Sequence, residues 1–126
     1  MHRLTIEQIT TMHSRLVMKT GGSDGIRDEG LLDSAVNAPF QSFGGYDVYP
    51  TIYEKAARLG FGLAHNHAFI DGNKRIAVVA ALMFLHGNGI EIDCTEFELF
   101  SEFYKLAASE VTFEELVNWI KNHEAK

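Results

Sequence analysis

The sequence predicts an all-α fold, a compact bundle of about six helices around one buried central helix. Three segments open with a capping box, in which a threonine is followed three residues later by glutamine or glutamate, the pairing that begins an α-helix. These boxes are Thr5 with Gln8, Thr95 with Glu98, and Thr112 with Glu115. The ten residues from Ile76 to Leu85 are apolar on every side of a helix, so other elements must surround them. The only alternation typical of a strand, Ile90–Asp93, is too short for more than an extended connector.

Apolar residues three and four positions apart predict the helices, and glycine or proline marks their boundaries. The helices are expected over about 5–19, 31–36, 51–66 and 74–86, with two more that open at Thr95 and Thr112. Gly21 and Gly22 end the first helix and Pro39 ends the second. Residues 40–49 combine glycines with aromatic side chains, which suits a mobile loop or a small flap hairpin. This flap is interpreted either as loop packing or as a docking element for a target protein.

Several side chains are assigned to the core or to the surface by their place on these helices. Lys55 and Arg58 are expected on a solvated helix face. Trp119 and an aromatic stripe are expected in the core, and the stripe consists of Phe97, Phe100, Phe103 and Tyr104. His13 lies on an apolar helix face and fits either a structural role or a role in a functional site.

Length and composition limit the kind of protein. A chain of 126 residues fits a single domain, residues 1–126, and the lone Cys94 cannot form an internal disulfide, as expected in a reducing cytoplasm. Residues 1–90 carry eight acidic and eight basic side chains, whereas residues 91–126 carry nine and three, which accounts for the net charge of −6. This balance argues against nucleic acid or an anionic membrane as a partner. The N-terminus does not resemble a signal peptide, so a cytoplasmic location is expected.

One segment, His67 to Arg75, holds residues that a helical bundle does not require. It leads into the N-terminus of the central helix, where unpaired N–H groups and the helix dipole favour an anion. Gly72 allows close approach of the backbone to a ligand. Asn73 can cap the helix or donate to an oxygen, and Lys74 lies beside Arg75 at a helix end that disfavours cations, which a bound polyphosphate would explain.

Two further residues of this segment suit phosphoryl or nucleotidyl transfer. Asp71 would hold a magnesium ion that bridges phosphate oxygens, and His67 could take a proton from an attacking hydroxyl. A zinc site made from His65, His67 and Asp71 is a weaker alternative because a fourth ligand is lacking.

The segment His-Ala-Phe-Ile-Asp-Gly-Asn-Lys-Arg, residues 67–75, resembles the signature of the Fic/Doc (Fido) family. His13, the Gly21-Gly22 pair, residues 25–32 and residues 87–89 extend the resemblance to the death-on-curing, or Doc-like, toxin branch. The resemblance covers about residues 5–93 and implies the helical Fido fold. It also implies that His67 is the base, that Asp71 holds Mg²⁺, and that Gly72, Asn73, Lys74 and Arg75 bind the phosphates of ATP.

The branch affects the expected reaction. Typical Fic proteins have glycine where this chain has Lys74, and they are implied to transfer AMP to a hydroxyl of a target protein. Doc-like toxins have lysine there and are implied to act as protein kinases that transfer the γ-phosphate of ATP. The resemblance therefore suggests phosphorylation of a Ser or Thr of a translation factor, with elongation factor Tu as the suggested substrate, and a halt of translation. An adenylyltransferase and an inactive binding module are the alternatives.

A toxin of this kind implies a partner that neutralises it. The chain shows no match to the inhibitory helix that some Fic proteins carry, so a cognate, Phd-like antitoxin acting in trans is expected. The acidic residues 91–126 are predicted to contact a basic or amphipathic segment of that antitoxin.

Overall fold

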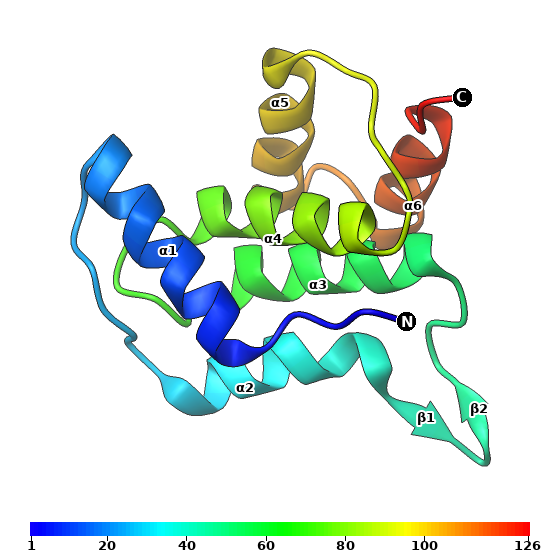
Figure 1. Ribbon diagram of the computed structural model, residues 1–126, viewed down its shortest axis with the longest axis horizontal. Coiled ribbons are helices and arrows are strands. Elements are labelled where there is room, and N and C mark those ends of the chain that lie inside the picture. The colour runs from blue at the N-terminus through cyan, green and yellow to red at the C-terminus, as the bar shows by residue number, and fades with distance from the viewer.

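The computed structural model describes residues 1–126 and shows a mostly helical chain with one very small sheet (Figure 1). The elements, in chain order, are α1 (Ile6–Thr20), α2 (Glu29–Asn37), the 3-10 helix η1 (Ala38–Phe40), β1 (Ser42–Phe43), β2 (Tyr46–Asp47), α3 (Ile52–Asn66), α4 (Asn73–Gly87), α5 (Glu96–Ala107) and α6 (Phe113–Asn122). The prediction of an all-α fold with six α-helices and a small hairpin is confirmed.

Helices α3 and α4 lie side by side and antiparallel at the centre, with α2 along one side of α3 and with α1 and α5 against α4 (Figure 1). Small residues of α3 make this close packing possible. A Cβ on Gly60 would lie 2.8 Å from the Phe103 ring, and one on Gly62 would lie 3.3 Å from the Cβ of Ala35. Neighbouring helices therefore occupy the space that side chains at these two positions would need.

Helix α4 is the buried central helix that the sequence predicts. The core includes eight residues of this helix, all with little or no exposed surface: Asn73, Ile76, Ala77, Val78, Ala80, Ala81, Phe84 and Leu85. The apolar members belong to a hydrophobic cluster of 24 buried residues contributed by several helices. Ala68 and Phe69, in the loop that precedes α4, belong to the same cluster, so the core holds this loop as well.

All three predicted capping boxes are present, and the structure adds a fourth at the start of α3. There Thr51 accepts a hydrogen bond from the backbone N–H of Glu54, and the Glu54 carboxylate accepts one from the backbone N–H of Thr51. The α2 helix begins instead at Asp28, whose carboxylate accepts from the backbone N–H of Leu31. Side-chain caps therefore define the start of every α-helix except α4, which begins after Gly72.

The cap of α5 allows a pH-dependent test of the fold. The backbone N–H and the hydroxyl of Thr95 donate to the Glu98 carboxylate at 3.1 and 3.0 Å and lower the pKa of Glu98 below its usual 4.5. The cap therefore stabilises the fold above the unfolded-state pKa, and this contribution is lost as the pH falls through the lower folded-state pKa. We expect Thr95→Val, which keeps only the backbone donor, to raise the Glu98 pKa in an NMR titration. An unchanged pKa would contradict the role given to the hydroxyl.

Two surface assignments made from the sequence are wrong. Lys55 is buried, because its ammonium group donates to the Tyr49 carbonyl and to the Asp47 carboxylate, the latter at 3.2 Å. Arg58 is half-buried, and its Nε lies inside without a hydrogen-bond partner. The segment between η1 and α3 folds over these side chains, and helical spacing alone does not reveal that cover.

The predicted aromatic stripe of α5 is only partly in the core. Phe103 is buried and Phe100 is half-buried, whereas Phe97 is 82% exposed and Tyr104 is 48% exposed. The stripe is therefore wider than the buried contact that α5 makes with the core.

The predicted flap hairpin forms, with Gly44 and Gly45 at its turn in positive-φ conformations. It joins the start of α3, whereas the segment at His67 follows the end of α3, and Figure 1 shows the two at opposite ends of this helix. A helix of 15 residues is about 22 Å long. The hairpin is therefore separated from the candidate site by the length of α3.

No helix combines the length and the apolar character needed to cross a membrane.

Candidate active site

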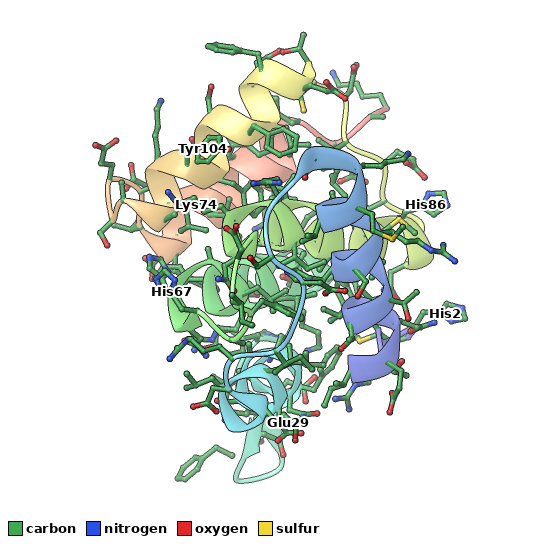
Figure 2. The ribbon with its side chains drawn as sticks, turned by 90° about the vertical axis from the view of Figure 1, so that its left-hand side faces the viewer. His2, Glu29, His67, Lys74, His86 and Tyr104 are labelled. Atoms are coloured by element: carbon green, nitrogen blue, oxygen red, sulfur yellow. The ribbon has the colours of Figure 1, made fainter.

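A pocket of ≈ 360 Å³ lies at the N-terminus of α4. It is lined by His67, Ile70, Asp71, Gly72, Asn73, Lys74, Arg75 and Tyr104. Figure 2 shows Lys74 between His67 and Tyr104 on one side of the molecule. The structure thus brings all six sequence-predicted site residues to one pocket, and it adds Tyr104 from α5.

The loop between α3 and α4 is held together by Asn73. The Asn73 side-chain oxygen accepts from the backbone N–H of Phe69, and its amide nitrogen donates to the Phe69 carbonyl, both at 3.0 Å. Both bonds are buried, and the Phe69 ring stacks on the His13 ring with centroids 3.8 Å apart. The side chain of Asn73 is therefore engaged with the loop, and only its backbone N–H faces an incoming anion.

His13 of α1 fixes the position of Asp71. The His13 ring is almost completely buried, and its Nε2 lies 2.6 Å from the Asp71 carbonyl oxygen. Because a carbonyl only accepts, Nε2 carries the proton. The other ring nitrogen, Nδ1, has no hydrogen-bond partner and lies 3.5 Å from the Asp24 carboxylate. His13 was expected to have either a structural role or a role in the functional site, and the structure shows that it contacts the site loop at Asp71.

The loop of residues 21–25 after α1, called the glycine loop here, packs directly against Asp71 of the site. A Cβ on Gly22 would lie 2.6 Å from the Asp71 carboxylate, and one on Gly25 would lie 2.9 Å from the Ile70 side chain. The Gly25 carbonyl also accepts from the backbone N–H of Ile70 at 3.0 Å. Glycine is required at Gly22 both for this approach and for its φ of 106°.

Gly21 and Gly22 provide a matched pair of variants. Both have positive φ, but a Cβ at Gly21 would meet nothing within 4 Å. We expect Gly21→Ala and Gly22→Ala each to lower the free energy of unfolding by about 1–3 kcal/mol through backbone strain. Only Gly22→Ala should also displace Asp71 and reduce activity. Equal activities of two folded variants, measured beside urea unfolding, would show that the contact with Asp71 is unimportant.

The start of α4 offers unpaired backbone donors. The N–H groups of Asn73, Lys74 and Arg75 make no hydrogen bonds, whereas the Gly72 N–H donates to the Asp71 carboxylate at 2.8 Å. Gly72 itself has φ 75°, a left-handed conformation that suits glycine. Three consecutive N–H groups and the positive end of the helix dipole form a suitable seat for phosphate oxygens.

The two cations of the site extend to different sides of it. The Lys74 ammonium lies 5.4 Å from the centre of the Tyr104 ring, a cation–π distance. The Arg75 guanidinium donates to the Thr20 hydroxyl and to the Gly21 carbonyl, the latter at 3.3 Å. Arg75 therefore joins α4 to the C-terminal end of α1, while Lys74 stays on the exposed side of the pocket.

His67 terminates α3 and has no side-chain partner. It is exposed and in the left-handed region, with φ 50° and ψ 46°, and neither ring nitrogen makes a hydrogen bond. Its backbone carbonyl accepts from Nε of Arg27 at 2.7 Å. The imidazole is thus free to accept a proton from a hydroxyl that enters the pocket.

The donor set fits a magnesium ion better than a metal held by protein alone. No group of three or more His, Cys, Asp or Glu side chains lies close enough together to hold a metal ion. His65, His67 and Asp71 therefore do not form the alternative zinc site. Asp71 offers one exposed carboxylate beside the unpaired N–H groups of α4. Magnesium usually takes one or two carboxylates and completes its shell with water and substrate phosphates, so the residues present are compatible with it.

Comparison with known proteins identifies the family. The sequence pattern of the Fic/DOC family matches residues 3–85, which is well over half of the chain. The chain belongs to the Fic/DOC family. It is 51% identical over 72 residues to "Toxin Doc" of Mycolicibacterium smegmatis, and the alignment covers 57% of this chain and 55% of that protein. It is 28% identical over 92 residues to "Protein kinase doc" of Escherichia phage P1, covering 73% and 72% of the two chains.

The family match confirms the resemblance predicted from the sequence, and both relatives bear Doc names. The matched region contains α1 to most of α4, and with them every candidate site residue except Tyr104. Sequence reasoning also gave no firm role to His13 or Arg27. The side chains of both contact loop residues 40 or more positions away, so only the fold reveals those contacts.

Proposed function

We propose that this Fic/DOC protein is a Doc-like toxin that acts as a protein kinase. It transfers the γ-phosphate of ATP to a Ser or Thr hydroxyl of a translation factor, with elongation factor Tu as the suggested substrate, and it thereby halts translation. The observation that carries this proposal is the single pocket that combines an unpartnered His67, the Asp71 carboxylate, two cations and three unpaired N–H groups. The names of the two relatives support it.

In the proposed reaction, His67 takes the proton of the target hydroxyl while the oxygen of that hydroxyl forms a bond to the γ-phosphorus. The bond from the γ-phosphorus to the β–γ bridging oxygen breaks, and ADP leaves. The N–H groups of residues 73–75 and the side chains of Lys74 and Arg75 stabilise the negative charge on the phosphate oxygens. Asp71 would hold magnesium, which neutralises phosphate charge when it is bound.

Two forms of labelled ATP test the proposed reaction. The chain is incubated with magnesium, purified elongation factor Tu or a bacterial translation lysate, and ATP labelled at either the α- or the γ-phosphate. We expect protein to retain label from the γ-position only. Label retained from the α-position would indicate AMP transfer and contradict the kinase proposal, and absence of protein label from both forms would favour a binding module.

A neutralising antitoxin is proposed as the second partner. The predicted contact lies on residues 91–126, which include α5 and α6, carry the whole acidic excess and fall outside the family match. Co-expression with the product of a neighbouring small reading frame should restore growth. An antitoxin interface that leaves residues 91–126 untouched would contradict the predicted contact.

A further inference from the structure

We propose that Arg27 is a positioning residue for His67. Its guanidinium holds the backbone of residue 67 in the conformation that directs the imidazole into the pocket. The inference rests on the proposed function, in which His67 is the base, and it adds a residue outside the 67–75 segment to the catalytic arrangement.

The backbone conformation at His67 needs support from its surroundings. His67 and Ser109 are the two non-glycine residues with positive φ in this chain. A side chain with a Cβ avoids the left-handed region unless neighbouring groups fix it there, and such conformations are enriched at functional sites. His67 directly follows the last residue of α3, so a small change in its φ and ψ angles would turn the imidazole away from α4.

No side chain orients the imidazole itself. A catalytic base is normally aligned by a third group that hydrogen-bonds its other nitrogen. Here neither ring nitrogen of His67 makes such a bond, and the side chain is exposed. The direction of the ring therefore depends on the backbone of residue 67 and on whatever holds it.

Arg27 holds that backbone through its side chain and its main chain. Its Nε–H donates to the His67 carbonyl at 2.7 Å, and its Nη2–H donates to the Asn66 carbonyl at 3.4 Å. The backbone N–H groups of Arg27 and Asp28 donate to the Ala68 carbonyl at 2.7 and 3.0 Å. Three successive carbonyls, those of residues 66, 67 and 68, are thus fixed from one side.

The guanidinium group suits this role for two reasons. The carbonyls at the C-terminus of α3 lack helical partners and carry partial negative charge, so a cation is favoured there. The planar fork of arginine can donate to two neighbouring carbonyls in a fixed geometry, which the single ammonium of lysine cannot reproduce. Arg27→Lys is therefore expected to keep the charge but to lose part of the alignment.

The test compares Arg27→Ala and Arg27→Lys with Arg15→Ala, which removes an exposed arginine of α1 that makes no hydrogen bond or ion pair. Transfer from γ-labelled ATP to protein in a bacterial translation lysate is measured against ATP concentration. We expect Arg27→Ala to lower the maximal rate roughly 10- to 100-fold, with the KM for ATP within about twofold of the parent. Arg27→Lys should lose less of the maximal rate, and Arg15→Ala should have the same maximal rate and KM as the parent.

Two further measurements separate alignment from a general effect on the fold. Added guanidinium ion should restore part of the Arg27→Ala rate and none of the His67→Ala rate. NMR couplings and shifts should show that His67 loses its positive φ in Arg27→Ala. A folded Arg27→Ala that transfers phosphate at the parent rate, or that changes only the KM, would overturn the inference.

Failure of the proposed function would be recognised separately. If the parent protein transfers no label, the kinase proposal fails, and the NMR measurement alone then decides on Arg27. A positive φ retained at His67 in Arg27→Ala overturns the positioning role, and its loss supports that role.

Discussion

Replacing His67 with alanine is expected to reduce phosphate transfer by about 10²- to 10⁴-fold, the usual contribution of a positioned general base. The fold should tolerate the change, because the imidazole is exposed and makes no hydrogen bond. Because the folded variant would transfer almost no phosphate, its expression should no longer arrest growth. Transfer from γ-labelled ATP, colony formation and the thermal midpoint, measured together, test this expectation.

The neighbouring His65 supplies the matched control. Its Nδ1 lies 3.0 Å from the Phe61 carbonyl and it does not line the pocket, so His65→Ala removes a nearby imidazole without touching the proposed chemistry. We expect His65→Ala to keep its activity and toxicity. If His67→Ala were as active and as toxic as the parent, the assignment of His67 as the base would be wrong.

Replacing Asn73 with alanine is expected to cost about 2–4 kcal/mol of unfolding free energy, because the buried N–H and carbonyl of Phe69 would both lose their partner. Activity should fall as well, since the loop carrying Asp71 would no longer be held. Urea unfolding measures the first effect, and the transfer assay measures the second. Asn37→Ala is the control. Asn37 is exposed, and the hydrogen bonds of its amide group to Asp33 should contribute much less to the free energy of unfolding.

Asn73→Asp separates the two hydrogen bonds. The aspartate can still accept from the Phe69 N–H, but its second oxygen would face the Phe69 carbonyl and the negative charge would lie at the phosphate site. We expect an intermediate stability and a loss of activity at least as large as that of Asn73→Ala. A variant as stable and active as the parent would show that the Asn73 amide group does not hold the loop.

Local signals in the sequence were sufficient to predict the helices. Capping boxes, glycines and prolines act within a few residues, so the predicted starts at Thr5, Thr95 and Thr112 agree with the structure. The buried central helix was predictable because its residues are apolar on every side. The fourth box, Thr51 with Glu54, is an equally local signal and is readable in the sequence in the same way.

The site could be located but not built from the sequence. The position of the 67–75 segment before a helix was readable, whereas the support of that segment by His13, Gly22 and Arg27 depends on α1 and the glycine loop folding back onto it. Tyr104 reaches the pocket only because α5 packs on α4, and no pattern around residue 104 indicates this. The burial of Lys55 likewise depends on the cover formed by the flap segment.

The side chain of Asn73 illustrates why residue type alone is ambiguous. An asparagine at the start of a helix can cap it, bind an oxygen or hold a loop. The buried pair of bonds to Phe69 shows that the third role uses both polar groups of the side chain. Under the proposed function, the phosphate site would then consist of the backbone N–H groups of residues 73–75 together with the side chains of Lys74 and Arg75.

The central claim is that the pocket at the start of α4 transfers a phosphoryl group. Its most direct test is intact-mass and peptide mass spectrometry of elongation factor Tu after incubation with the chain, magnesium and unlabelled ATP. We predict a mass gain of one phosphoryl group on a single Ser or Thr with the parent protein, and none with His67→Ala. A gain that corresponds to an adenylyl group, or an identical phosphoryl gain with His67→Ala, would contradict the account.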